Sequence, residues 1–171
     1  MELQESAKLR QSFATLKSAY LSLPLEIRPK LRATVLLGEM VTLIRLNDMS
    51  LNAVWKGGQT GYDIQLVMNG GEKRVEVKTC NIDNTWVKGG RPVGCSGIKP
   101  SKFDYLVFVT FSEFVEEVKF YVLTSEETKR FKKVGKNIYR QSGETEDRVL
   151  DIGSDDTQPS SLGAWSKMLH P

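Results

Sequence analysis

Residues 61–79 read GYDIQLVMNGGEKRVEVKT, and this stretch decides the fold. Asn69-Gly70, near its centre, is a dipeptide favoured by two-residue hairpin turns of type I′, because both turn positions take a positive φ. The flanking segments 62–68 and 73–80 carry apolar residues that alternate with polar ones, as in strands with one buried face. The stretch therefore predicts a β-hairpin.

The position of the turn determines which side chains share a face of the hairpin. With the turn at Asn69-Gly70, Asp63 lies directly opposite Glu76. Lys78 follows two residues further along the strand and therefore lies on the same face. A turn at Gly70-Gly71 would instead place Asp63 opposite Lys78, but all three charged residues would still share that face.

The other face of the hairpin is apolar in the first of these registers. Ile64 faces Val75, and Tyr62 faces Val77. This pairing supports the register independently, because a shift by one residue would mix the apolar and the charged side chains.

Two carboxylates in facing positions repel each other, since their Cβ atoms lie about 5 Å apart. A divalent cation between Asp63 and Glu76 would offset the repulsion, and Mg²⁺ commonly binds one or two carboxylates together with water and a phosphate. Lys78 would add a positive charge that can contact a phosphate oxygen or orient a water molecule. The alternative is an exposed strand face on which Glu76 and Lys78 are ordinary surface charges.

Two helices are predicted before the hairpin. Residues 3–22 carry an apolar stripe at helical spacing, formed by Leu9, Phe13, Leu16 and Tyr20. The stripe either packs on the core of its own chain or contacts a second copy. Residues 29–46 are apolar on nearly all sides, so we expect a buried helix there.

Glu39, in the middle of the second helix, needs a partner, because a buried carboxylate without one is costly. A metal ion or a basic side chain would satisfy it. Alternatively, Glu39 turns outward beside Arg32, Thr42 or Arg45, or forms a buried ion pair with Arg45.

The remaining elements follow from the same criteria. Residues 84–102 are rich in Gly and Pro and are predicted to form a long loop. The chain beyond Gly143 is predicted to be mostly loop. Further strands are expected at 53–56, 103–111 and 118–123, and further helices at 125–133 and 162–169. Asp104 begins one of these strands and is expected to be a strand-end polar group rather than a ligand.

The composition matches a single α/β domain. A chain of 171 residues suffices for one core, and its first twenty residues are charged throughout, so we expect no signal peptide, no membrane anchor and a cytoplasmic protein. His170 is the only histidine, and Cys80 and Cys95 match no zinc spacing. These counts argue against a zinc site or a histidine-based triad and favour chemistry by carboxylates, lysine and a hard metal ion.

Basic residues gather in two segments that contain no acid, 84–102 and 129–140, although the net charge of +3 identifies no partner. Such segments can contact phosphates electrostatically. Each segment alone is equally compatible with a solvated loop or helix end. The cations of the first segment are Lys88, Arg91, Lys99 and Lys102.

Several of these segments together resemble a known family. A helix with Gly38-Glu39, then Gly61-Tyr62-Asp63-Ile64, a hairpin, and Val75-Glu76-Val77-Lys78-Thr79 resemble the PD-(D/E)xK nuclease superfamily. The resemblance covers roughly residues 31–132, and Tyr62 stands where the name of the superfamily has proline. It implies a restriction-endonuclease-like αβββαβ core, an α/β fold with a central mixed sheet flanked by helices. Residues 1–30 would then be an N-terminal helical extension of one nuclease domain, and 133–171 a C-terminal extension.

The resemblance also implies roles for the site residues. Asp63 and Glu76 would bind Mg²⁺, for which Mn²⁺ can substitute, with help from the Val77 carbonyl. Lys78 would position or activate the attacking water, and Glu39 would act as an outer-shell or second-metal ligand.

For the whole protein, the resemblance implies a homodimer that cuts double-stranded DNA, most directly a type II restriction or related defence endonuclease. A homing or Holliday-junction nuclease is the near alternative, and a non-catalytic DNA-binding protein with a degenerate nuclease fold is a more distant one. The loop 84–102 would contact the DNA through the four cations named above and Trp86, although Trp86 can equally pack under the loop.

Overall fold

A computed structural model gives the structure of the chain and describes residues 3–24, 33–57, 61–68, 71–81, 94–111, 118–129, 148–151 and 164–169. No helix in these ranges is long and apolar enough to cross a membrane. The division of the chain at residues 30 and 132 stays a prediction.

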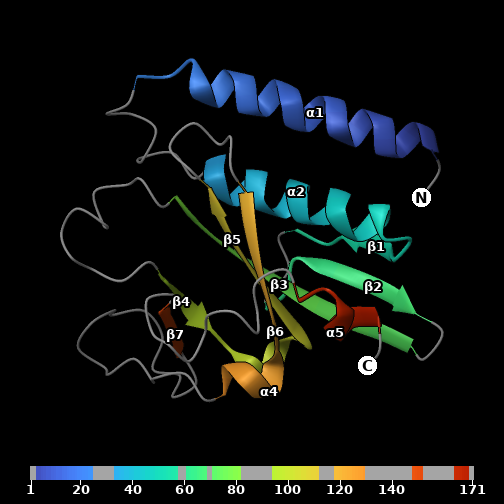
Figure 1. Ribbon diagram of the computed structural model, residues 1–171, viewed down its shortest axis with the longest axis vertical. Coiled ribbons are helices and arrows are strands. Elements are labelled where there is room, and N and C mark those ends of the chain that lie inside the picture. Colours follow the sequence, from blue (N-terminus) through green and yellow to red (C-terminus); the bar gives the residue numbers. More distant parts are fainter. Residues whose placement is uncertain are drawn as a thin grey trace.

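A five-stranded mixed sheet forms the centre of the fold. Its strands are β1 (Asn52–Trp55), β2 (Ile64–Met68), β3 (Gly71–Asn81), β5 (Tyr105–Phe111) and β6 (Val118–Thr124), in the spatial order β1-β2-β3-β5-β6. The pair β3–β5 is parallel, and the other neighbours are antiparallel. With helices packed against it, the sheet confirms the predicted α/β class with a central mixed sheet flanked by helices (Figure 1).

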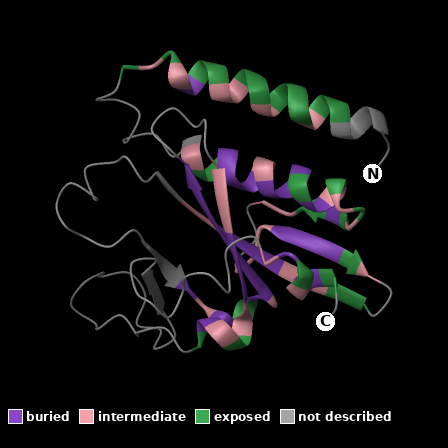
Figure 2. Cartoon of the chain, in the orientation of Figure 1, coloured by how far each residue is buried: buried purple, intermediate pink, exposed green. Residues whose placement is uncertain are grey.

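β5 is the most deeply buried strand of the sheet. Every residue of its sequence YLVFVTF is buried, and Figure 2 shows it buried along its length. A continuous apolar run of this kind is expected for a strand with a parallel neighbour and covered faces, because neither face can be polar.

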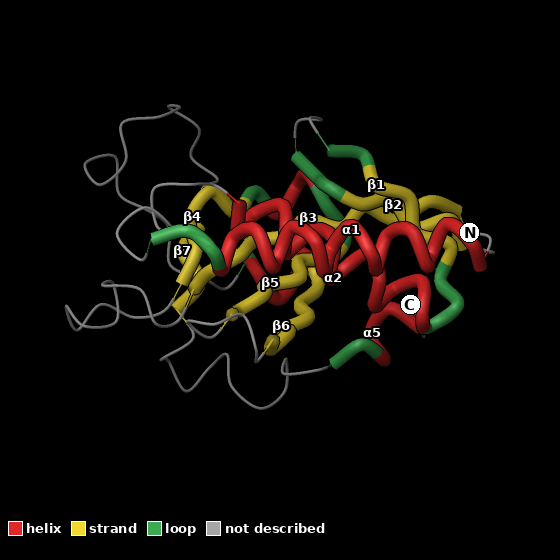
Figure 3. The backbone as a smooth tube through the Cα atoms, turned by 90° about the horizontal axis from the view of Figure 1, so that it is seen from above, coloured by secondary structure: helices red, strands yellow, loops and turns green. Residues whose placement is uncertain are grey.

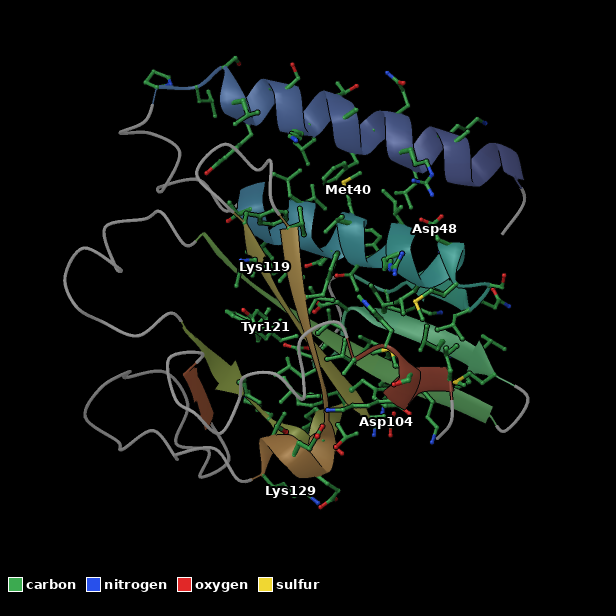
Figure 4. All side chains as sticks on the ribbon, in the orientation of Figure 1. Met40, Asp48, Asp104, Lys119, Tyr121 and Lys129 are labelled. Atoms are coloured by element: carbon green, nitrogen blue, oxygen red, sulfur yellow. The ribbon has the colours of Figure 1, made fainter. Side chains whose placement is uncertain are left out.

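Two helices form successive layers over one face of the sheet. α1 (Leu3–Leu21) lies outside α2 (Ala33–Asp48), and α2 lies against the sheet (Figures 1 and 3). The predicted stripe of α1 packs on the chain's own core, through Leu9, Phe13, Leu16 and Tyr20. Arg10 of α1 forms an ion pair with Asp48 of α2, and Figure 4 shows Asp48 on the side of α2 that faces α1.

The expectation that the second helix is buried nearly all round is wrong for its first turns. Val35 and Leu36 are 42% and 41% exposed. Neither α1 nor the sheet covers these two side chains fully, because a helix held between two layers keeps uncovered flanks.

A second, two-stranded sheet occupies segments that were predicted as loop. β4 (Gly94–Ile98) pairs antiparallel with β7 (Arg148–Asp151). The loop prediction is wrong here because each strand is short, and β4, with sequence GCSGI, has little intrinsic strand preference. A strand of this kind depends on a partner that is distant in the sequence, which local patterns do not reveal.

Apolar side chains on the face opposite the helices form a second cluster, namely Ile98, Phe103, Leu106, Phe108, Tyr121 and Leu123. Tyr62 packs against this second cluster. The prediction that Tyr62 lies opposite Val77, on the face of Ile64, is therefore wrong. The regular pairing of β2 ends at Ile64, and the chain before it is free to turn to the other face.

Two short helices complete the described structure. α4 (Ser125–Thr128) begins with a capping box, in which Thr124 and Glu127 bond reciprocally. Asp104, near α4 in Figure 4, accepts hydrogen bonds from the backbone N–H and the side chain of Arg74, as expected for a strand-end polar group. In α5 (Ser166–Leu169), Lys167 Nζ donates to Glu127 Oε1 at 2.7 Å and to the Val122 carbonyl at 3.1 Å.

α2 lies very close to the sheet at Gly38. A Cβ atom at this position would lie 2.0 Å from Thr79 Oγ1 of β3. A Cβ fits there only if Thr79 or the helix moves, so the absence of a Cβ permits this short distance between α2 and β3. That distance also sets the position of the next residue, Glu39.

We expect Gly38→Ala to lower the free energy of unfolding by about 1–3 kcal/mol, the usual cost of overpacking. The sign is informative, because the same change in a helix with free space stabilises by about 1 kcal/mol. Chemical denaturation measures the effect. The double variant Gly38→Ala/Thr79→Ala removes the clashing hydroxyl and should recover part of the loss, whereas a single variant as stable as the wild type would contradict this close packing.

The bond between Glu127 and Lys167 gives a pH-dependent prediction. Partial burial opposes ionisation of Glu127, but its bonds with Lys167 and Thr124 outweigh burial and lower its pKa below 4.5. A lowered carboxyl pKa stabilises the fold above the unfolded value of 4.5, and the stabilisation is lost as pH falls through the folded value. Glu127→Gln, which keeps a capping side chain, should cost about 1 kcal/mol at neutral pH and nothing in strong acid. The exposed Glu126→Gln is the matched control and should have little effect at either pH.

Candidate active site

The hairpin has the predicted register. Met68 pairs with Gly71 and Ile64 pairs with Val75, and these pairs bracket the predicted turn, whose residues 69 and 70 lie outside the described part. β3 then changes neighbours, because its residues from Val75 onward pair with β5. Val75 is thus the only residue of β3 paired on both sides in the described sheet. Beyond it, the side of β3 that faces β2 is left without a strand partner.

Asp63 occupies this vacated side of β3. Its backbone N–H donates to the Val75 carbonyl at 2.9 Å, which shows that the regular ladder does not continue. Its carboxylate accepts a hydrogen bond of 2.7 Å from the Val77 N–H. The prediction that Asp63 lies directly opposite Glu76 in the ladder is therefore wrong in detail, but the carboxylate reaches the backbone between Glu76 and Lys78.

Glu76 and Lys78 lie on the same face of β3 and form an ion pair with each other. Glu76 is buried and Lys78 is half-buried, with 27% of its side chain exposed. On the adjacent strand β5, Glu76 pairs with Leu106 and Lys78 pairs with Phe108, and both of these apolar residues belong to the second cluster. The alternative of an exposed strand face with ordinary surface charges is thus wrong.

Glu39 reaches the same site from α2. It is buried, whereas Arg45 is exposed, so the alternative that Glu39 turns outward is wrong. Its Oε2 accepts a hydrogen bond of 2.7 Å from Trp55 Nε1, at the end of β1. Trp55 was not singled out in the sequence. Its one available signal is its position as the last apolar residue of a short strand, directly before the glycine-rich connector.

Burial raises the pKa of all three carboxyl groups. For Glu39, the Trp55 hydrogen bond opposes the rise, while the negative charges of Asp63 and Glu76 add to it. For Asp63, burial raises the pKa, against the Val77 N–H and the charge of Lys78. The structure therefore brings the four predicted residues within electrostatic reach of one another.

Glu76 lies among charges of both signs. Burial raises its pKa, Lys78 lowers it, Asp63 raises it, and Lys99 lowers it. Glu39 and Glu76 are buried beside Lys78 and Asp63 is partly buried, and each of the three carboxyl groups is harder to ionise than in water. A cation that enters the site is stabilised by the same groups.

The residues present fit a hard divalent cation with few protein ligands. In the described ranges, no group of three or more His, Cys, Asp or Glu side chains is arranged to hold a metal ion. The available donors are Asp63, Glu76 and a backbone oxygen. In a strand, the N–H and C=O of one residue point to the same side, so the Val77 carbonyl faces the gap as its N–H does. Mg²⁺ suits this donor set, because it keeps several waters and binds substrate phosphate.

The predicted nucleic-acid contacts are only partly described. Trp86, Lys88 and Arg91 lie outside the described residues. Lys99 precedes the short 3-10 helix Pro100–Lys102 and is close enough to Glu76 for its charge to lower that pKa. Lys102 is exposed, and the stem of its side chain lies against Gly61, where a Cβ would be 2.8 Å from Lys102 Cβ.

Comparison with known proteins gives little beyond the fold. No family model matches the sequence, and no curated protein is significantly similar to it. Among solved structures, the chain is similar to a bacterial homing endonuclease, I-Ssp6803I, with 14% sequence identity and a TM-score of 0.47. The match covers 77% of this chain and 88% of that chain.

We expect Trp55→Phe to raise the pKa of Glu39 further, because it removes a hydrogen bond to the charged form of the carboxyl. Titration of ¹³C-labelled glutamate side chains by NMR measures the change. Val54→Ala is a suitable control, since Val54 precedes Trp55 on β1 and is exposed. An unchanged Glu39 titration in Trp55→Phe would contradict the bond between these side chains.

Proposed function

We propose that the protein is a metal-dependent nuclease that hydrolyses phosphodiester bonds in DNA. One observation carries the proposal: Glu39, Asp63 and Glu76 are brought together with Lys78 where β2 leaves β3. These residues come from α2, from the segment that leads into β2, and from β3. A purely structural role would not require three carboxylates whose burial makes their charged forms costly.

The chemistry follows from the charges of the site. A phosphodiester is an anion, so three carboxylates repel it unless a cation lies between them and the substrate. When bound, the metal ion supplies charge neutralisation at the phosphate and a water of lowered pKa. Asp63, Glu76 and the Val77 carbonyl would hold Mg²⁺, and Mn²⁺ would substitute. These assignments follow from the resemblance to the PD-(D/E)xK superfamily.

Lys78 has a separate role in the proposal. Its ammonium pairs with Glu76 in the structure, so it lies beside a proposed metal ligand. Once a cation occupies the partner carboxylate, the ammonium can contact a phosphate oxygen or orient the attacking water. Glu39, held by Trp55, would act from outside, as an outer-shell or second-metal ligand.

The proposal extends to the biological role of the nuclease. A homodimeric type II restriction or related defence enzyme leads, because two symmetric sites suit the cutting of two strands. A homing or junction-resolving nuclease would use the same chemistry. The form of DNA that is cut distinguishes these enzymes. Discrete fragments from plain duplex favour a restriction enzyme, and cutting only at branches favours a junction-resolving enzyme.

We expect Mg²⁺-dependent cleavage of DNA that is absent in EDTA, with Asp63→Asn, Glu76→Gln and Lys78→Met each reducing the rate about 100-fold or more. The assay uses mixed-sequence duplex, branched and single-stranded DNA. Glu72→Gln is the matched control, because Glu72 lies on β3 but is exposed and pairs with Val67 outside the site. Circular dichroism checks that each variant is folded.

Two outcomes would count against the proposal. The absence of cleavage on all three substrates in Mg²⁺ and in Mn²⁺ would refute the nuclease function. Normal cleavage by folded Lys78→Met would refute this site even if the protein cuts DNA.

A further inference from the structure

Trp55 is an exposed indole at the edge of the candidate site. It is 51% exposed, the highest value among the large apolar residues that the structure describes as exposed. Leaving a tryptophan in water forgoes a large part of the hydrophobic stabilisation that its burial would give. The position of this ring therefore calls for a reason other than stability.

The ring is held in place at two points. Its Nε1 donates to Glu39 Oε2 at 2.7 Å. Its benzo edge lies against the backbone of Gly57, where a Cβ would be 2.0 Å from Trp55 Cζ2. A ring fixed in this way loses little further freedom when a ligand packs on it, so binding costs less conformational entropy.

The ring is also fixed relative to the charged groups. The next residue, Lys56, donates its backbone N–H to the Asp63 carbonyl at 2.7 Å. The indole bonds to Glu39, whose carboxylate is close enough to Asp63 and Glu76 for their charges to raise its pKa. An apolar surface thus lies beside the proposed phosphate-binding site.

We propose that Trp55 is a stacking platform for an unpaired nucleobase beside the phosphate that the site binds. This inference rests on the proposed function for the position of that phosphate. Bases inside a duplex already stack on their neighbours, whereas an unpaired base offers a free face. The preferred substrate would then be single-stranded DNA, or a duplex with a single-stranded flap or branch. Within the proposed function, the stacking role thus favours the junction-resolving alternative over a restriction enzyme.

Binding without cleavage tests the inference. Fluorescence anisotropy in Ca²⁺, which supplies a hard divalent cation in place of Mg²⁺, compares labelled single-stranded, flapped and blunt duplex DNA. Trp55→Ala should weaken binding to the first two about 5- to 100-fold, the range found for loss of one base–aromatic stack, and should affect blunt duplex little. Trp55→Phe keeps an aromatic face and should retain most of the affinity.

Val67→Ala is the matched control, because Val67 is 45% exposed on the neighbouring strand but is not aromatic. It should bind like the wild type. Equal losses of affinity in Val67→Ala and Trp55→Ala would overturn the inference, because a side chain without an aromatic ring would then contribute as much as the indole. Unchanged binding by Trp55→Ala, or no binding of any DNA by the wild type, would overturn it as well.

The binding assay and the cleavage assay test the stacking role and the nuclease function separately. Cleavage with normal binding by Trp55→Ala would leave the nuclease function standing and remove the stacking role. If the protein binds unpaired DNA through Trp55 but never cleaves it, the stacking role stands and the nuclease function is refuted. The site would then serve binding alone.

Discussion

The hydrogen bond from the Val77 N–H to the Asp63 carboxylate is the interaction on which the site depends. It lies where the β2–β3 ladder ends, after the pair Ile64–Val75. A strand that stops pairing in the interior of a sheet leaves backbone groups without partners, which is costly when they are buried. Here a side chain replaces the missing strand, and the replacement is a carboxylate whose second oxygen remains available.

The same junction explains how the three carboxyl groups come together, with Glu39 and Glu76 buried and Asp63 partly buried. β5 and the second cluster cover Glu76 from one side, and α2 brings Glu39 from the other. Burial penalises their charged forms, and only the Trp55 bond, the Val77 N–H and nearby lysines offset that penalty. The charged groups of such a site destabilise the fold, because their partners offset the cost of burial only in part. Proteins commonly place such groups where they bind or react.

Much of this arrangement could be predicted from the sequence, because it follows from local rules. The Asn69-Gly70 signal and the alternation around it were enough for the hairpin register, and the helix with Glu39 needed only its apolar pattern. The departure of Asp63 from the ladder, the turn of Tyr62 to the other face and the pairing of β4 with β7 were missed. Each depends on contacts between segments far apart in the chain, as does the bond from Trp55 to Glu39.

The change of partner at Val75 also has a consequence for the order of folding. The first half of β3 pairs within a short hairpin, but its second half pairs in parallel with β5, which begins more than twenty residues later. Parallel pairing across such a separation is slow compared with hairpin closure, because the intervening chain must first lose its freedom. Glu76 and Lys78 lie in the second half, so a chain that has closed only its hairpin has no assembled site. Any activity of this site therefore reports on the completed sheet rather than on its fastest-forming part.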